Sequence, residues 1–304
     1  MSEVATRIAA ARAGDQHEFS SLTEPYRREL QVHCYRILGS LQDAEDLVQE
    51  TLLRAWRRID TYEGRASLRA WLYKIATNAC LDALDKYPRR ALPATTHPIS
   101  DPSQPPAPPA GEAGHVWLEP LPDDLLAESA TGPEARYAMH ESVTLAFLAA
   151  LQVIPPRQRV VLILRDVLDW RASEVAELLD LTVSAVNSAL HRARTTLARH
   201  YHTGGRDAMK MLRSEDSLRA LLDRYVHAWE SADVDGLTAL LKEDATLNMP
   251  PSPSWYRGRT AIQAFFASYL FSGDARGRWR LQATRANAQP AFALYQLDET
   301  GGVY

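Results

Sequence analysis

Apolar residues recur at helical spacing along much of this chain of 304 residues. From about residue 3 to 90 the spacing predicts helices throughout, with interruptions at Pro25 and at Gly39. Helical spacing returns at about Arg136 and continues until Gly204-Gly205 ends it. The pattern therefore predicts two all-α blocks with an aperiodic segment between them.

A third pattern begins near Ser214, where an amphipathic helix and a short helix precede strand-like runs. The runs cover 245–249, 278–286 and 291–296, with a further helix over about 260–270. Helices mixed with short strands predict an α+β domain. The ending, Gly301-Gly302-Val303-Tyr304, is typical of a strand that has only begun, so we expect the sheet of this domain to be incomplete.

The segment between the helical blocks, 91–135, differs from both. It holds most of the prolines, contains no Lys or Arg, and carries seven acids. Such sequence does not bury enough apolar surface to fold alone, which predicts an extended acidic linker. An apolar patch, Val116 to Pro122, interrupts it. A pure spacer needs no such patch, so it is either a docking segment or a contact with a neighbouring domain.

Charge and cysteine content narrow the class of protein. The formal net charge is −4, so any nucleic-acid contact must come from local clusters of cations. Cys34 and Cys80 lack CxxC spacing, which favours buried thiols in a reducing compartment over disulfides or a metal site. No signal peptide is visible, and no apolar run approaches the roughly 20 residues of a membrane span. We expect a cytoplasmic protein without membrane contact, metal or cofactor.

The most informative motif runs from Asp43 to Trp56. As a helix it turns Val48 and Leu52 towards a core and leaves a polar stripe of Asp46, Gln49 and Glu50. On spacing alone, such a stripe is an ordinary solvated helix face. The motif resembles, however, the core-polymerase-binding helix of bacterial RNA polymerase sigma factors of the extracytoplasmic-function group. That resemblance implies that the stripe binds core RNA polymerase, on a basic coiled coil of its largest subunit.

Residues 174–190 fit a helix-turn-helix, in which the small Ala176 lets two helices approach and Asp180 begins a tight turn. The second helix carries no acid and accumulates cations, which suits contact with phosphates. An ordinary helical hairpin is the alternative. Because a recognition helix presents its N-terminal part to base edges, the candidates for base contact are Ser184, Asn187, Ser188 and His191, with Arg192 and Arg194 for the DNA backbone.

Together with 151–162, this motif resembles the domain of the sigma family that reads the promoter −35 element. The family often has Gly at the turn, and a Lys and an Arg early in the recognition helix. Here Asp180, Asn187 and Ala189 hold those positions. Asp can adopt the left-handed conformation of such a turn, so we expect the fold to survive, while the bases read at −35 are left open.

Residues 62–78 resemble the family's segment for promoter melting and −10 recognition. Opened DNA exposes unstacked bases, which aromatic and guanidinium faces can hold. The resemblance implies DNA contact by Gly64, Arg65, Arg69, Lys74 and Asn78. Trp71 fits a core position at least as well. In this family the linker passes through the active-site cleft of the polymerase, where an acidic segment would imitate nucleic acid, although a solvated linker would have the same composition.

The last part of the chain, from Tyr225 onwards, resembles a SnoaL-like domain of the nuclear-transport-factor-two superfamily, a cone-shaped α+β fold. Such domains often enclose an apolar pocket, and some are enzymes. The candidate lining residues are Tyr225, Trp229, Met249, Trp255, Phe265 and Tyr269. Plain core packing explains the same side chains. No convincing acid/base pair accompanies them, so we expect no enzyme.

These observations leave three functions open. The first is a sigma factor, with a polymerase-binding and −10-reading domain (1–90), a linker (91–135), a −35-reading domain (136–206) and a SnoaL-like regulatory domain (207–304). The second is a stand-alone helix-turn-helix regulator, which leaves the Asp43 to Trp56 motif unexplained. The third is a SnoaL-type enzyme with a DNA-binding appendage. Neither the ligand of the last domain nor the sign of its control follows from the sequence.

Overall fold

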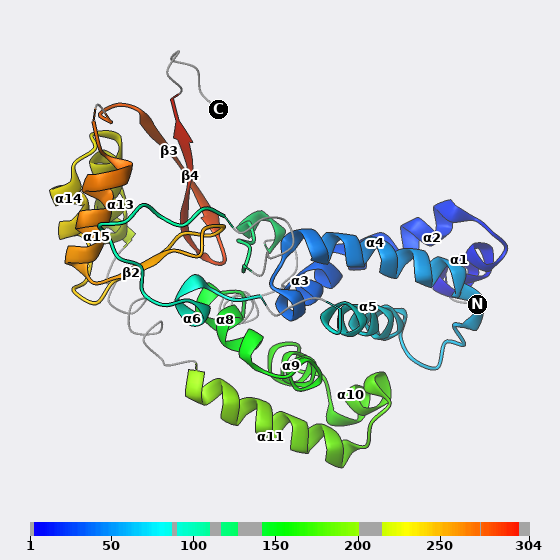
Figure 1. Ribbon diagram of the computed structural model, residues 1–304. Coiled ribbons are helices and arrows are strands. Elements are labelled where there is room, and N and C mark those ends of the chain that lie inside the picture. The colour runs from blue at the N-terminus through cyan, green and yellow to red at the C-terminus, as the bar shows by residue number, and fades with distance from the viewer. Residues whose placement is uncertain are drawn as a thin grey trace. The chain divides into compact units, whose positions relative to one another are not determined.

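A computed structural model describes residues 3–86, 90–109, 117–126, 142–200, 215–273 and 275–297 (Figure 1). The chain divides into two compact units. The first comprises Met1–Arg90 and Leu118–Tyr201, and therefore contains both helical blocks. The second comprises Ala91–Trp117 and His202–Tyr304. The endings predicted at Gly204-Gly205 and at Gly301–Tyr304, and the helical return near Arg136, lie outside the described residues.

The first helical block consists of α1 (Glu3–Arg12), α2 (Gln16–Thr23), α3 (Arg27–Leu38), α4 (Leu41–Arg57) and α5 (Leu68–Leu84). Its predicted interruptions are confirmed. Pro25 lies in a 3₁₀ turn between α2 and α3, and Gly39 ends α3 with φ 75°, a left-handed conformation that favours glycine. All residues of α3 from Leu30 to Leu38 are buried, which makes it the central helix of the block.

Helix α4 contains the Asp43 to Trp56 motif and is capped at its start by Ser40. The Ser40 hydroxyl accepts a hydrogen bond from the backbone N–H of Asp43 at 3.0 Å, which caps the first turn. Val48, Thr51 and Leu52 are buried on the inner face. The cysteines lie in the same core, where both Cys34 and Cys80 are buried free thiols, as predicted.

The second helical block consists of α8 (Leu145–Val153), α9 (Pro156–Leu162), a π-helical turn (Ile163–Val167), α10 (Ala172–Leu179) and α11 (Val183–His200). Helices α10 and α11 form the predicted helix-turn-helix. Val175 and Val186 are fully buried between them. Asp180 ends α10 with φ 54° and ψ 46°, so it does adopt the left-handed conformation expected of it.

The second unit combines α13 (Glu215–Glu230), α14 (Val234–Ala239) and α15 (Arg259–Phe265) with two small antiparallel sheets (Figure 1). Strand β1 (Thr246–Asn248) pairs with β2 (Trp255–Arg257), and β3 (Trp279–Ala286) pairs with β4 (Gln289–Gln296). The predicted α+β character is therefore confirmed. An aromatic core holds the unit together, in which the Trp229 ring meets Phe266 and Phe271 edge to face at 5.6 and 5.2 Å.

Part of the predicted linker packs on this second unit. It forms a short helix, α6 (Pro93–Thr96), and then runs along β2. The Trp255 indole N–H donates to the His97 carbonyl at 2.8 Å, and the Ser100 N–H donates to the Trp255 carbonyl at 3.0 Å. Trp117, from the apolar patch, donates its indole N–H to the Pro251 carbonyl at 3.1 Å. These residues of the linker are ordered by contacts, not solvated as a free spacer would be.

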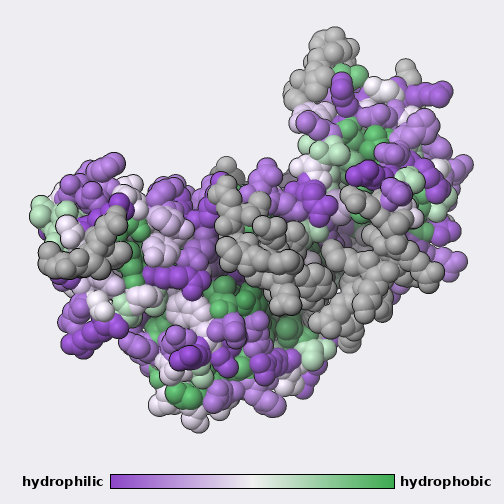
Figure 2. Space-filling model, turned by 180° about the vertical axis from the view of Figure 1, so that it is seen from behind, coloured by the Kyte–Doolittle hydropathy of each residue, from purple (hydrophilic) through white to green (hydrophobic). Residues whose placement is uncertain are grey.

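Figure 2 shows mainly hydrophilic residues on one face, with small apolar patches between them. Large apolar residues that are exposed occur singly, as Leu53 on α4 and Leu294 on β4 do. No described helix combines the length and the apolar character that a bilayer crossing requires.

Candidate nucleic-acid interface

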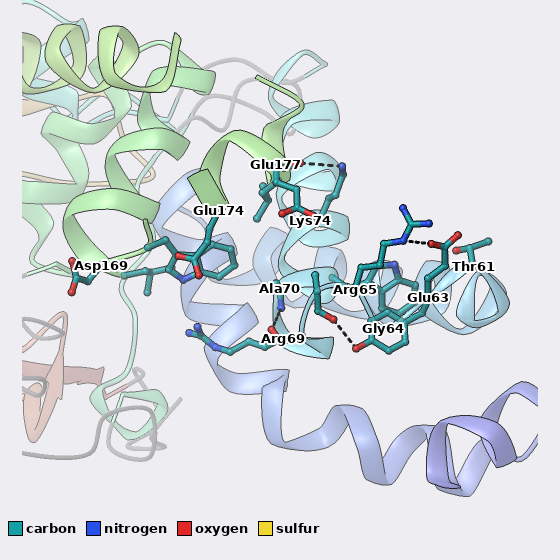
Figure 3. A pocket seen from close by; sticks show the side chains of 17 residues that line it. Thr61, Glu63, Gly64, Arg65, Arg69, Ala70, Lys74, Asp169, Glu174 and Glu177 are labelled. Atoms are coloured by element: carbon teal, nitrogen blue, oxygen red, sulfur yellow. Dashed lines mark hydrogen bonds and ion pairs between the residues drawn. The ribbon is translucent and has the colours of Figure 1, made fainter. Parts of the chain in front are cut away.

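A half-open cavity of about 880 Å³ lies within the first unit, between the two helical blocks (Figure 3). The first block contributes the loop before α5 and the outer face of that helix. The second contributes the chain that leads into α10, and α10 itself. The lining residues are Thr61 to Ser67, Arg69, Ala70, Trp71, Lys74, Leu168, Asp169, Trp170, Glu174, Glu177 and Leu178.

The loop before α5 is held by its own side chains. The Tyr62 hydroxyl donates to the Ala66 carbonyl at 2.9 Å, and the Tyr62 ring lies 5.3 Å from the Trp71 ring. Burial raises the pKa of Tyr62, which remains a neutral hydrogen-bond donor at pH 7. Arg12 of α1 donates to the carbonyls of Ile59 and Tyr62, where the loop begins. Two aromatic rings, tilted to each other by 46°, are thus held beside an exposed loop.

Four of the five residues predicted to contact −10 DNA line this cavity. Gly64 has φ 75° and is exposed at the tip of the loop. Arg65 is also exposed and pairs with Glu63 at 2.7 Å (Figure 3). Arg69 and Lys74 lie on α5 and face the second block. Asn78, one turn further along α5, is exposed outside the cavity.

Arg69 and Lys74 each have partners within the first unit. Arg69 donates to both carboxylate oxygens of Glu29 at 2.9 and 3.0 Å, and its guanidinium lies over the Tyr73 ring at 4.8 Å. Lys74 contacts the second block, since its ammonium lies 2.9 Å from an Asp180 carboxylate oxygen. Both cations are about 40% exposed and can still meet a nucleic acid.

The recognition helix α11 separates cleanly into two faces. Val186, Ala189, Leu190 and Ala193 are buried against the rest of the block. All the residues predicted to contact −35 DNA are exposed: Ser184, Asn187, Ser188, His191, Arg192 and Arg194. Arg194 forms a bidentate pair with Asp166, at 2.7 and 2.8 Å, and this hydrogen bonding raises the pKa of Arg194. Ala189, where the family often has a cation, is turned inwards.

The polar stripe of α4 lies at the surface, with one difference from expectation. Asp46 and Gln49 are exposed. Glu50 is only partly so, because its carboxylate accepts a 2.7 Å hydrogen bond from Arg54 one turn later. That hydrogen bond raises the pKa of Arg54, which also pairs with Asp82 at 3.5 Å. The stripe is therefore acidic at Asp46 and internally neutralised at Glu50.

The candidate pocket residues of the second unit do not share one face. Trp229 and Phe265 belong to the aromatic core, and Tyr225, Met249 and Tyr269 pack against it. Trp255 points away from this core, because it alternates with the fully buried Tyr256 along β2. Its partners are the linker residues His97 and Ser100.

Sequence reasoning missed two residues of the first unit. Trp170 lines the cavity, with its ring 5.2 Å from Tyr73. Glu119, in the apolar patch of the linker, accepts hydrogen bonds from the backbone N–H groups of Leu41 and Gln42, at the start of α4. Neither has a local signature, because each of these contacts joins residues at least 77 positions apart.

A helix-turn-helix with an exposed polar second helix, beside a cavity of aromatic rings and cations, is typical of a DNA-binding protein. Comparison with family models agrees with this class. The chain matches Sigma-70 region 2 over residues 22–90, Sigma-70 region 4 over residues 144–197 and a SnoaL-like domain over residues 222–304.

A relative that matches nearly the whole chain shows the family. The ECF RNA polymerase sigma factor SigG of Mycobacterium tuberculosis is 47% identical over 290 residues, which cover 94% of this chain and 75% of the relative. SigW of Bacillus subtilis is 28% identical over 192 residues, which cover 63% of this chain and 92% of SigW. The crystal structure of M. tuberculosis SigJ shares the fold, with a TM-score of 0.52 and 21% identity over 93% of this chain and 87% of SigJ.

The chain belongs to the extracytoplasmic-function (ECF) RNA polymerase sigma factors. Sigma factors bind core RNA polymerase and promoter DNA to initiate transcription, and they are not enzymes. The family predicted from the Asp43 to Trp56 motif is confirmed, and with it the SnoaL-like domain. The stand-alone regulator and the SnoaL-type enzyme are set aside.

Proposed function

We propose that this sigma factor engages its partners through three surfaces of the first unit. The proposed domains of the chain are 1–90 (polymerase binding and −10 recognition), 91–135 (linker), 136–206 (−35 recognition) and 207–304 (SnoaL-like). The first surface is the α4 stripe of Asp46, Gln49 and Glu50, which docks on the basic coiled coil of the largest polymerase subunit. Its support is the exposure of Asp46 and Gln49 next to a helix face that is otherwise buried. A cationic partner would also compete with Arg54 for Glu50.

The second surface is the cavity before α5, which takes the −10 strand once the DNA opens. Gly64 lets a nucleotide approach the loop, the partly exposed Trp71 ring offers a face for stacking, and Arg65, Arg69, Lys74 and Asn78 follow the backbone or base edges. The cavity of about 880 Å³ is the observation that carries this assignment, because it combines aromatic walls with three cations.

The third surface is the exposed face of α11, which lies in the major groove of the −35 element. Ser184, Asn187, Ser188 and His191 would contact base edges, while Arg192 and Arg194 would contact phosphates. Support comes from the division of the helix, since every one of these side chains is exposed and the intervening apolar residues are buried.

The SnoaL-like domain would control these activities through the linker. Within the second unit, four linker residues are hydrogen-bonded to the SnoaL-like part: Ala94 to Asn248, His97 to Trp255, Ala107 to Ser254 and Trp117 to Pro251. A linker held there is not free to enter the polymerase cleft. We therefore expect the SnoaL-like domain to restrain transcription, whether or not a small ligand binds it.

Run-off transcription with purified core polymerase tests the proposal. Lys74→Ala should lower promoter opening, and Trp117→Ala should raise transcription by freeing the linker. A chain ending near Gly205 should be at least as active as Trp117→Ala. Equal transcription by the full chain, by Trp117→Ala and by the shortened chain would contradict restraint by the SnoaL-like domain. Full promoter opening by Lys74→Ala would contradict the −10 assignment.

A further inference from the structure

One edge of the second helical block rests on the residues proposed to hold −10 DNA. This edge consists of Trp170, Glu177 and Asp180, at the two ends of α10. We infer that it is a docking surface that imitates a nucleotide, so that in the free sigma factor the chain's own region 4 occupies part of the −10 site. The inference rests on the proposed function, because it takes Arg69 and Lys74 to be DNA-binding residues.

Trp170 takes the place of a base. Its side chain is only 8% exposed, and its ring lies 5.2 Å from the Tyr73 ring of α5. The guanidinium carbon of Arg69 lies 5.7 Å from the centre of the Trp170 ring and 4.8 Å from that of Tyr73. Trp170 thus meets an aromatic ring, tilted to it by 46°, and a guanidinium, the two kinds of group that proteins use to hold unstacked bases.

Asp180 and the end of α10 take the place of a phosphate. The Lys74 ammonium lies 2.9 Å from an Asp180 carboxylate oxygen. It also donates to the Glu177 carbonyl at 3.3 Å (Figure 3). That carbonyl belongs to the last turn of α10, where the helix dipole is negative. Lys74 therefore meets a formal negative charge and a carbonyl oxygen together, as it would on a DNA backbone.

The contact of Trp170 and the contact of Asp180 differ in their exposure to water, so they have different roles. The Trp170 ring is buried, and its own backbone is fixed because its N–H donates to the Leu164 carbonyl at 2.9 Å. The Asp180 carboxylate remains 78% exposed. The ring thus supplies a durable contact, whereas the ion pair is weak and salt-sensitive, and a DNA phosphate can displace it.

Occupation of the site has a measurable consequence. A single strand can place a base against Tyr73 and a phosphate on Lys74 at the same time only in molecules whose α10 edge has moved away. The apparent affinity of the free chain for single-stranded DNA is therefore the intrinsic affinity multiplied by the fraction of molecules in that open state. Substitutions that weaken the α10 edge, and that leave the first block unchanged, should raise this fraction.

The test measures binding of the full chain, without polymerase, to a fluorescein-labelled single strand of about 12 nucleotides that spans the −10 element of a promoter its holoenzyme transcribes. Asp180→Asn keeps the left-handed turn and removes the negative charge that pairs with Lys74, and it should tighten binding by about threefold. Trp170→Ala should tighten it by about tenfold. Because Trp170→Ala also removes a buried ring, Asp180→Asn carries the test if that variant does not fold.

Asp169→Asn is the matched control. Asp169 also has a positive φ, of 53°, and also lines the cavity from the second block, but among the described residues it forms no ion pair with a cation of the first block. Its substitution should leave the affinity unchanged. Equal tightening by Asp169→Asn and Asp180→Asn would overturn the inference, because it would indicate a general effect of charge.

No tightening by either edge variant would overturn it as well. The proposed −10 function is judged separately, by promoter opening with Lys74→Ala holoenzyme. Normal opening there would remove the −10 assignment, whatever the free chain does. Impaired opening, combined with unchanged binding by Asp180→Asn and Trp170→Ala, would contradict only the inference that the α10 edge occupies the −10 site as a nucleotide would.

Discussion

The Glu119 carboxylate caps the helix that begins at Leu41. One of its oxygens accepts the backbone N–H groups of Leu41 and Gln42 at 2.8 and 3.2 Å, and the other accepts the Ser40 hydroxyl at 2.9 Å. Arg90 completes the arrangement, with contacts of 3.1 Å to Glu119 and 2.6 Å to Asp43. A residue of the linker thus supplies negative charge to the N-terminus of the proposed polymerase-binding helix.

Glu119→Ala should lower the free energy of unfolding of the first unit by about 1–2 kcal/mol, because charge-assisted hydrogen bonds to a helix start are lost. Thermal and urea unfolding, followed by circular dichroism, measure the change. Asp124→Asn is the control, since Asp124 is exposed in the same segment. Identical stability of Glu119→Ala and the parent chain would mean that water replaces this cap without loss.

Asp46→Arg should weaken binding to core polymerase by at least about tenfold, because it reverses an exposed charge that faces a basic partner. The double variant Asp46→Arg with Glu50→Arg should abolish binding, although its second change also places two arginines one turn apart. Fluorescence anisotropy with labelled sigma factor gives the affinities. Asp60→Arg, an exposed acid outside α4, should bind normally. Normal binding by the double variant would exclude the α4 stripe from the interface.

His33 should make the first unit sensitive to acid. It is buried beside Thr77, and burial, followed by the charges of Arg36 and Arg69, lowers its pKa from 6.5 to about 3. The imidazole of His33 is neutral above pH 6.5 in both the folded and the unfolded state, so it does not lower the free energy of unfolding there. As pH falls from 6.5 towards 3, the unfolded state alone gains the proton, and stability falls by up to about 1.4 kcal/mol per pH unit.

Urea unfolding at pH 7 and pH 5 checks this sign. His33→Gln should flatten the fall in stability between the two values, because glutamine does not titrate in this range. His227→Gln, at an exposed position of α13, should retain the slope of the parent chain. An unchanged slope for His33→Gln would show that another group controls the acid response.

Arg12→Ala should slow promoter opening several-fold without changing affinity for core polymerase. The guanidinium holds the carbonyls of Ile59 and Tyr62, so its loss loosens the loop that carries Gly64. Fluorescence of 2-aminopurine placed in the −10 element follows the opening. Arg27→Ala removes a half-exposed arginine that pairs with the neighbouring Glu24 at 3.1 Å, and it should open the promoter at the parent rate.

Asn187→Ala and Arg192→Ala should affect −35 recognition in different ways. Loss of a base-reading amide relaxes preference at one base pair, by about 1–3 kcal/mol, whereas loss of a phosphate contact weakens all sequences equally. Transcription from promoters with single −35 substitutions separates the two patterns. A uniform loss with Asn187→Ala would assign that side chain to the DNA backbone instead.

Local sequence signals predicted the helices and their ends. The spacing of Val48 and Leu52 describes the buried face of α4 correctly, and the turn at Asp180 follows from the conformations open to aspartate. What the sequence could not provide are contacts between distant residues. The position of Trp170 against Tyr73, and of Glu119 at Leu41, depends on packing between separate segments.

Strand β2 shows the same limit within three residues. Alternation predicts that Trp255 and Tyr256 face opposite sides, yet both are large and aromatic. Only the packed structure shows that Tyr256 enters the core and that Trp255 meets the linker. Glu50 is a further case, because its pairing with Arg54 is visible as helical spacing but its reduced exposure is not.

Asp180 illustrates how a single position can be restricted by two unrelated demands. A left-handed turn is open to glycine, asparagine and aspartate at modest cost. An ion pair with Lys74 requires a negative charge, which only aspartate among these three provides. Random substitution at this codon should therefore yield variants that fold well and retain the helix-turn-helix, yet differ from the parent in how readily the free protein meets single-stranded DNA. A screen for stability alone would pass over them.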